Sequence, residues 1–468
     1  MEKFVLRLLS VGLALWLGTP ASTAQTWDRD VAPGILFRME RQANPPRNTY
    51  GLRIDPKIVR AESTLGGDSI YDLSPNNGRR TMSRMVQEHE AIGGVNGDYF
   101  QFGGDPGGDP SNLMVHGGEL LSQPGSGPRG VAVGWDALMN LSMGNGEWTA
   151  TFSVNGGPPQ AIAGLNTRTE GDRVTLSTDS AGYAYAPGEA TAARVQVGAY
   201  RLSADRTVAG TVLDVVPLGR ERLRVAPGEM ILSGSGKSAD AVRSLRPGDT
   251  VRVTVRVTGF DWNRVQEVIG GGPILLQGGK NVLPSRPDNF NDTRHPRTAM
   301  GRTADGHIWF LLTDGRQSMS VGATVADLAE ILQRWGCTEA INLDGGGSSA
   351  MNLLGVTLNR PSGGIERAVA NGVLLYGRRP ASSPKDLKIV PVTGGIVVGT
   401  PVRLSVTAEN APVPVSRILF TAQGAGWIDQ EGMFHPEKEG TAEVTVLVDG
   451  ATAQIRLTVT PRPTAPTP

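Results

Sequence analysis

The chain has 468 residues, with 45 basic and 45 acidic side chains and a formal net charge of zero. This balance argues against a general binder of nucleic acid or of anionic membranes, since both carry a basic excess. The length leaves room for two to four domains. The 62 glycines and the short alternating runs favour a β-rich fold with many turns. The single cysteine, Cys337, excludes an intrachain disulfide.

Residues 1–24 have the pattern of a signal peptide. Lys3 and Arg7 precede an apolar run from Leu8 to Leu17, and small residues at 22–24 supply a cleavage site. The run is too short to span a membrane, and no other run is long and apolar enough. We therefore expect export to the periplasm or the exterior, without membrane insertion after processing. An uncleaved N-terminal anchor is the alternative.

The remaining chain predicts an α+β fold: a mixed-sheet catalytic region with few helices and a β-rich insertion, followed by a β-sandwich. A helix is expected over Thr81–Glu90, leading into a strand at Ala91–Val95. The expected segments are a catalytic region over residues 25–378, the insertion at about 136–259, a linker at 379–385, the sandwich at 386–460 and a disordered tail at 461–468.

A strand, a helix and a second strand follow one another in the second half of the catalytic region. The strand His307–Leu312 precedes a helix that Thr324 and Asp327 cap and Gly336 ends, and the strand Glu339–Leu343 comes next. This order predicts a crossover that pairs two parallel strands. The residues after both strands, 314–316 and 344–347, would then meet at one edge of the sheet, where ligands bind in such folds.

The run Asp344-Gly345-Gly346-Gly347-Ser348-Ser349 is the most informative stretch. Three glycines in a row are costly to order, so an ordered run indicates that a group approaches the backbone closely. Free N–H groups and two hydroxyls would suit an anion. A plain glycine turn with Asp344 as its cap is the alternative.

Four loops carry carboxylates, arginines and serines: residues 96–100, residues 295–298, residues 314–316 with Ser320, and residues 344–349. There is no P-loop, dinucleotide fingerprint, zinc spacing or nucleophile elbow. Arginine grips phosphate, and carboxylates stabilise the charge that develops at an anomeric carbon. These loops therefore indicate a site for a substrate with both sugar and phosphate.

The same runs resemble the phosphodiester glycosidase family, whose animal member is the lysosomal uncovering enzyme. The resemblance is carried by residues 96–100, 297–301, 314–316 and 342–349, with an end motif at 366–371, and covers roughly Ala91 to Tyr376. Asp98 stands where members of that family often have glycine. The C-terminal part resembles bacterial immunoglobulin-like domains, through Gly426-Trp427-Ile428-Asp429 and Gly432-Met433-Phe434.

The residues and the resemblance together give a set of candidate site residues. The catalytic candidates are Asp344, Asp314 and Asp98. The substrate-binding candidates are Asn96, Arg297, Thr298, Arg316, Ser320, Asn342, Gly345, Gly346, Gly347, Ser348, Ser349 and Arg367. No metal or cofactor is expected. A divalent cation near Asp98 or Asp344 stays an alternative that no ligand spacing demands.

The expected activity is hydrolysis of a sugar-1-phosphate diester in a surface or cell-wall glycan, with that glycan as the partner and no nucleic acid. One alternative is a phosphodiesterase that cuts the P–O bond. The other is a glycan-binding protein without catalysis, which the immunoglobulin-like part suggests.

Overall fold

The structure is a computed structural model that describes residues 24–102, 107–127, 129–284, 288–390 and 392–462. The predicted signal peptide, apart from its last residue, lies outside the described residues, as does most of the predicted tail. Strands hold 46% of the residues and helices 9%, which confirms the predicted β-rich α+β fold with few helices. The four α-helices of the described part are α1 (Met82–Glu88), α2 (Ala239–Arg243), α3 (Asn289–Asp292) and α4 (Val325–Arg334).

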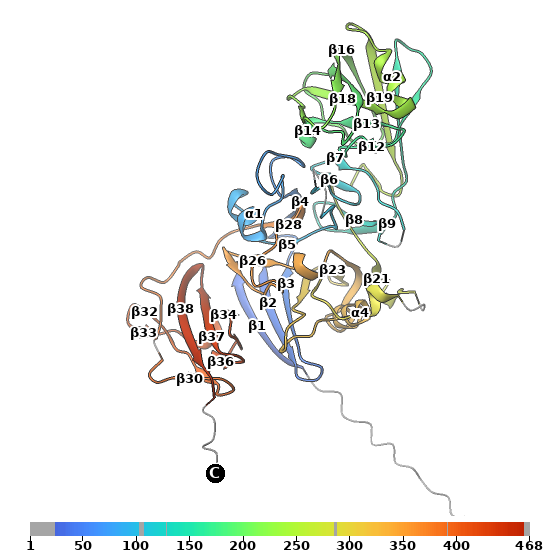
Figure 1. Cartoon of the computed structure of the whole chain (residues 1–468). Helices are drawn as coiled ribbons and strands as arrows, with labels where there is room; N and C mark the ends of the chain where they lie inside the picture. Colours follow the sequence, from blue (N-terminus) through green and yellow to red (C-terminus); the bar gives the residue numbers. More distant parts are fainter. Residues whose placement is uncertain (1–23, 103–106, 128, 285–287, 391, 463–468) are drawn as a thin grey trace, which may run out of the picture.

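An eight-stranded sheet forms the main body of the molecule (Figure 1). In spatial order its strands are β1 (Gln25–Ala32), β2 (Ile35–Gln42), β3 (Arg47–Ile54), β24 (Ile308–Thr313), β23 (Arg297–Thr303), β25 (Cys337–Asn342), β21 (Ile274–Gln277) and β22 (Lys280–Asn281). Helix α4 covers one face with Leu328 and Leu332, which pack on Trp309. Its predicted cap is present, since Thr324 and Asp327 exchange side-chain and backbone hydrogen bonds.

A five-stranded sheet covers the other face of the main sheet. Its strands are β27 (Val356–Thr357), β26 (Met351–Leu353), β5 (Gly93–Asn96), β28 (Asn371–Tyr376) and β4 (Arg60–Leu65). Phe37, Leu52 and Phe310 of the main sheet share one core cluster with Val95 and Val373 of this second sheet. Helix α1 lies on the second sheet through Met82 and Met85. The two sheets therefore pack face to face around one hydrophobic core.

The segment from β10 to β19 forms a separate sheet that projects away from the main body (Figure 1). Its strands are β11 (Gln160–Ile162), β10 (Trp148–Val154), β19 (Thr250–Val257), β16 (Arg206–Leu218), β15 (Ala190–Gln196), β18 (Glu229–Ser235), β13 (Val174–Ser177) and β12 (Gly164–Leu165), with a small ladder of β14 (Tyr183–Ala184) and β17 (Leu223–Arg224). A connecting sheet contains β7 (Glu119–Ser122), β6 (Met114–His116), β20 (Glu267–Gly271), β8 (Val131–Trp135) and β9 (Leu141–Gly144).

The C-terminal strands surround a hydrophobic core of their own and lie beside the main body, away from the sheet that contains β10 and β19 (Figure 1). They are β29 (Lys388–Ile389), β32 (Val406–Ala408) and β33 (Ala411–Pro412); β30 (Ile396–Val397), β38 (Ala451–Thr460), β37 (Gly440–Val448) and β34 (Leu419–Gly424); and β31 (Val402–Arg403), β36 (Met433–Pro436) and β35 (Gly426–Ile428). We call this part the C-terminal sandwich. Its assignment to the immunoglobulin-like class stays a prediction.

The C-terminal sandwich is fastened to the first two strands of the main sheet. Trp427 is 6% exposed and belongs to the core cluster of the main body. The guanidinium of Arg41 lies 4.9 Å from the centre of the Trp427 ring, and His435 stacks on it at 4.1 Å. Arg29 donates to the carbonyl oxygens of Ile418 and Gln430. These contacts form a packed interface, which we call the seat of the sandwich, between the sandwich and the first two strands of the main sheet.

Replacing Trp427 with alanine tests this seat. We expect Trp427→Ala to lower the free energy of unfolding by about 3–5 kcal/mol, because a large buried ring leaves a cavity that its surroundings fill only partly. Urea denaturation followed by circular dichroism measures the loss. Thr458→Ala, at an exposed position of β38, is the control and should change the value by less than about 0.5 kcal/mol. Equal values for both variants would contradict the seat.

Candidate active site

Three strands of the main sheet bring the candidate residues to one edge. Arg297 begins β23 and pairs with Thr313 at the end of β24. Asn342 ends β25 and pairs with Ala299 of β23. The predicted pairing of two parallel strands is wrong, because β23 lies between β24 and β25 and is antiparallel to both. Two antiparallel steps restore the direction, so β24 and β25 run parallel and end at the same edge, as expected.

Each glycine of the loop after β25, residues 344–349, is closely approached by another part of the protein. A Cβ at Gly345 would lie 2.8 Å from the carbonyl oxygen of Pro296. Gly346 has a φ of +63°, and a Cβ there would lie 3.1 Å from Nη2 of Arg316. A Cβ at Gly347 would collide with the guanidinium of Arg367. Gly345 is thus needed because a backbone carbonyl occupies the space of a side chain, and Gly346 because of its positive φ, whereas a side chain at Gly347 would require Arg367 to move.

The amides of this glycine loop bond mainly within the protein. Gly345 donates to Oδ1 of Asp344 at 2.7 Å, and Gly346 donates to the carbonyl of Pro296 at 2.8 Å. Ser348 and Ser349 donate to carbonyls of the loop itself. The expected cluster of free N–H groups is therefore largely taken up internally, and the positive potential of the site comes from arginine side chains instead.

Arg297 is buried, with 1% of its surface exposed. Its Nε donates to the carbonyl of Ala323, and its Nη2 donates to the carbonyls of Phe290 and Thr293. The guanidinium also lies 4.6 Å from the centre of the Phe290 ring. Burial lowers the pKa of Arg297, and the negative charge of Asp344 opposes this shift. Neutral carbonyls and a ring hold the cation without cancelling its charge.

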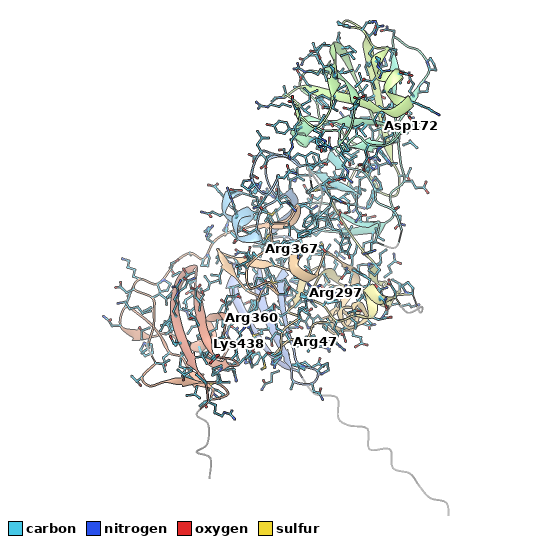
Figure 2. All side chains as sticks on the ribbon, in the orientation of Figure 1. Arg47, Asp172, Arg297, Arg360, Arg367 and Lys438 are labelled. Atoms are coloured by element: carbon cyan, nitrogen blue, oxygen red, sulfur yellow. The ribbon has the colours of Figure 1, made fainter. Side chains whose placement is uncertain are left out.

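Arg316 and Arg367 approach the glycine loop from two further elements. Nε of Arg316 donates to Nδ1 of His295 at 3.4 Å. Nη1 of Arg367 donates to Oγ of Ser348 at 3.4 Å, and its guanidinium lies 4.6 Å from the Phe102 ring centre. Figure 2 shows Arg297 and Arg367 in the main body. Among the described residues, no carboxylate forms an ion pair with these three arginines, so their charges remain available to an anion.

Asp344 lies half-buried at the start of the loop. Burial raises its pKa to about 6, and the shift is limited by hydrogen bonds from Ser348 and the Gly345 amide and by the charges of Arg367 and Arg297. Its carboxylate is mostly ionised at neutral pH and can still take up a proton. The group can therefore act as a base or as a nucleophile there.

Asp98 is a second carboxyl group with an altered pKa, and it is 1% exposed. The amide and the side chain of Asn112 donate to its two oxygens, at 2.8 and 2.7 Å. Burial raises its pKa to about 8, and the charge of Asp344 adds to the increase. Asp98 is thus mostly protonated at neutral pH, while Asp344 is mostly ionised. Two carboxyls with separated pKa values are the usual arrangement of an acid and a base.

A buried polar layer supports the glycine loop. Nδ2 of Asn96 donates to the carbonyl of Asp344 at 2.7 Å. Its Oδ1 accepts from the Thr298 hydroxyl at 2.8 Å, and this hydroxyl also contacts Oγ of Ser349. Nδ2 of Asn342 donates to Tyr99 and to main-chain carbonyls. These four candidates, Asn96, Thr298, Asn342 and Ser349, are at most 2% exposed, and their polar groups hold the loop in place.

Asp314 and Ser320 lie two strands away from Asp344. The Tyr50 hydroxyl donates to Oδ2 of Asp314 at 3.0 Å, and the Arg360 amide donates to Oδ1 at 2.9 Å. The Ser320 hydroxyl donates to the Asp314 carbonyl at 2.7 Å. Burial raises the pKa of Asp314 to about 7, and Asp344 is not among the causes. The structure therefore does not bring Asp314 and Ser320 to the glycine loop as it does the arginines.

Sequence reasoning did not select three residues that take part in the site. Asn112 holds both oxygens of Asp98, but it lies beyond a glycine-rich loop and had no pattern to indicate it. The Tyr99 hydroxyl donates to the Gly272 carbonyl at 2.8 Å, and its ring meets Phe290 edge-on. The third residue is His295. Burial and the nearby Arg316 and Arg297 charges lower its pKa, so it accepts from Arg316 as a neutral ring.

The described residues contain no group of three or more His, Cys, Asp or Glu side chains that could hold a metal ion. In the same part of the chain, no helix combines the length and the apolar character that a membrane crossing needs.

Comparison with known proteins gives one family match and several similar folds. Residues 203–376 match the phosphodiester glycosidase family model. This phosphodiester glycosidase segment contains Arg297, Arg316, Asp344 and Arg367. It begins three residues before β16 and leaves out Asn96 and Asp98, which the resemblance by motif had included.

The other matches cover part of the chain or part of the relative. Over 80 residues the chain is 41% identical to the SPbeta prophage-derived uncharacterized protein YomE of Bacillus subtilis (strain 168). The matched residues are 17% of this chain and 12% of that protein. A hypothetical protein from Synechocystis has a similar crystal structure, with a TM-score of 0.62 and 18% identity over 76% of this chain and 65% of that one.

A second crystal structure has the same fold. It is that of a Burkholderia pseudomallei K96243 protein named as a candidate exported protein, with a TM-score of 0.58 and 22% identity over 71% of this chain and 74% of that one. At these identities both structures establish the fold alone.

The coupling between the two carboxyls can be tested by titration. We expect Asp344→Asn to lower the pKa of Asp98 below about 8, because the charge of Asp344 helps to raise it. Carboxyl carbon NMR of aspartate-labelled protein measures this pKa. Asp305→Asn is the control, since Asp305 is exposed in the turn between β23 and β24. An Asp98 pKa that is the same in both variants would show that the two groups are not coupled.

Proposed function

We propose that the chain is an exported hydrolase that cleaves a sugar-1-phosphate diester in a surface or cell-wall glycan. The observation that carries the proposal is the convergence on the glycine loop, beside Asp344, of three arginines that form no ion pair with the residues the structure describes, in the segment that matches the phosphodiester glycosidase family model. An anionic diester would supply the negative charge that balances these arginines. The signal-peptide pattern of residues 1–24 supports export.

In the proposed reaction the arginines would hold the phosphate while Asp344 acts on the sugar side. Asp344 would accept a proton from a water molecule while the oxygen of that water attacks the anomeric carbon. The bond between that carbon and the phosphate oxygen would then break. The products are a free sugar and a phosphate monoester. The charge of the departing monoester would be stabilised by Arg297, Arg316 and Arg367, so a strong acid is not essential. Asp98, protonated at neutral pH, would assist as a proton donor.

The bond that breaks can be identified with labelled water. Hydrolysis of a panel of sugar-1-phosphate methyl diesters, including that of N-acetylglucosamine, in ¹⁸O-water should place the label in the sugar. Mass spectrometry of the two products measures its position. Label in the phosphate would overturn the proposal in favour of a phosphodiesterase that cuts the P–O bond.

Removal of the Asp344 charge tests its role in the same assay. We expect Asp344→Asn to lower kcat about 100- to 10,000-fold, the range for loss of a general base. Asp305→Asn should leave kcat unchanged, since this carboxyl lies in an exposed turn away from the site. Turnover that survives in Asp344→Asn would show that another group acts on the sugar.

The pH dependence of kcat/KM follows from the two carboxyl groups. Activity should fall below a pH of about 6, where Asp344 becomes protonated, and above about 8, where Asp98 loses its proton. Initial rates between pH 4 and 10 measure this bell-shaped profile. Asp98→Asn should remove the alkaline limb and keep the acidic limb. A profile whose alkaline limb persists in that variant would exclude Asp98 as the donor.

A further inference from the structure

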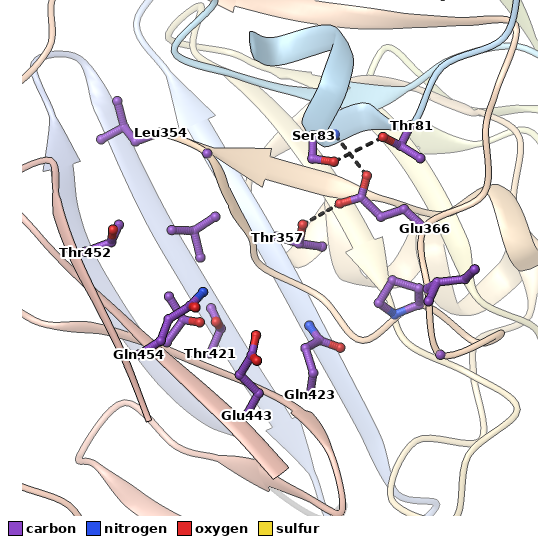
Figure 3. Close-up of a pocket in the computed structure, with 16 residues that line it drawn as sticks. Thr81, Ser83, Leu354, Thr357, Glu366, Thr421, Gln423, Glu443, Thr452 and Gln454 are labelled. Atoms are coloured by element: carbon purple, nitrogen blue, oxygen red, sulfur yellow. Dashed lines mark hydrogen bonds between the residues drawn. The ribbon is translucent and has the colours of Figure 1, made fainter. Parts of the chain in front are cut away.

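A groove separates the main body from the C-terminal sandwich. Its larger part has a volume of about 640 Å³. One wall is the segment 354–366 with the start of α1, where Glu366 accepts from the Ser83 amide and from the Thr357 hydroxyl (Figure 3). The opposite wall is the sandwich sheet, through Thr421, Gln423, Glu443, Thr445, Thr452 and Gln454.

The groove continues toward the glycine loop. A second cavity of about 390 Å³ shares Pro361, Gly364 and Gln423 with the first, so the two cavities are neighbours. Its lining includes Arg316, the residue whose guanidinium meets Gly346. The groove thus starts beside the candidate active site and runs along the sandwich.

The end of the groove near the site is cationic. Arg316, Arg360 and Lys438 line it, with Glu437 as the only carboxylate in its lining. Nη1 of Arg360 and Oε1 of Glu437 form a buried ion pair at 3.6 Å, so Glu437 balances the charge of Arg360. Arg316 and Lys438 supply the remaining positive charge of this end. This end can therefore bind an anion.

The far end of the groove has a different character. Threonine hydroxyls, glutamine amides and the carboxylates of Glu366 and Glu443 line it, and these groups suit the hydroxyls of neutral sugars. The first end can hold a phosphate of the chain, and the carboxylates, hydroxyls and amides of the second end can hold the hydroxyls of its sugars. The contacts of Trp427 hold the sandwich against the main body, which limits the ordering that binding between the two parts requires.

We propose that this groove binds the rest of the glycan chain on the phosphate side of the cleaved bond, as a polymer of sugars joined by phosphodiesters. Lys438 would take the next phosphate along the chain, and the sandwich would take the sugars beyond it. The inference rests on the proposed function for the position of the cleaved bond. It makes the sandwich part of substrate recognition.

Two substrates of different length test the proposal. The short probe is the methyl diester of a sugar 1-phosphate, and the long probe is a tetramer of the same units, with N-acetylglucosamine as the default sugar. We expect Lys438→Glu to lower the ratio of kcat/KM for the long probe to that for the short probe about tenfold, as for loss of one charged contact. Lys388→Glu, an exposed charge reversal elsewhere on the sandwich, should leave the ratio unchanged.

A second pair of variants, one in the groove wall and one outside it, tests the effect of a bulky side chain without altering charge. Gln454→Trp places a bulky ring at an exposed position of the groove wall, and Thr458→Trp places it farther along the same strand, outside the groove. The first should lower the ratio and the second should not. An unchanged ratio in both Lys438→Glu and Gln454→Trp would overturn the proposal.

Binding separates failure of this inference from failure of the proposed function. Calorimetry with the tetramer and Asp344→Asn protein measures affinity without turnover. If neither probe is hydrolysed by the unmodified protein, but the tetramer binds and Lys438→Glu weakens it, the groove stands and the proposed reaction is wrong. If the probes are hydrolysed, but neither groove variant alters tetramer affinity or the ratio, the groove proposal is wrong and the reaction stands.

Discussion

Guanidinium groups packed against glycine backbone determine the character of the candidate site. Arg316 and Arg367 lie where side chains of Gly346 and Gly347 would be, and Arg297 packs beside Gly345. The positive charges of these arginines repel one another. Neutral carbonyls and aromatic rings hold the cations without cancelling their charge. An anion in their midst removes that repulsion. The proposed binding of a phosphate group rests on this arrangement.

Burial affects three aspartates in the same direction, and their neighbours separate them. Burial raises the pKa of Asp98, Asp314 and Asp344. Asp344 has Arg367 and Arg297 nearby and stays the most acidic, whereas Asp98 faces the charge of Asp344 and is the least acidic. Asp314 is held between Tyr50 and the Arg360 amide, which gives it a place in the link to the sandwich. One sequence feature, an aspartate after a buried strand, thus leads to different chemistry in different surroundings.

Much of the fold was accessible from local sequence patterns. The caps of Thr324 and Gly336 and the apolar spacing between them predicted α4 correctly, because these signals act over a few residues. Strand neighbours depend on contacts between distant segments, so the intervening position of β23 could not be read from chain order. The same limit explains why Asn112 was missed, since its partner Asp98 lies across a glycine-rich loop. Of the loop amides, that of Gly346 has a distant partner, the carbonyl of Pro296, whereas those of Gly345, Ser348 and Ser349 bond within the loop itself.

The attachment of the sandwich has a consequence for how the chain can be divided. Met39, Leu419, Trp427 and Leu447 belong to one core cluster that spans residues from both ends of the chain. A shortened chain that stops near residue 380 would expose an apolar face on the first strands and would lose the wall that faces residues 354–366. Such a fragment would be prone to self-association. The sandwich and the first strands of the main sheet therefore share one core.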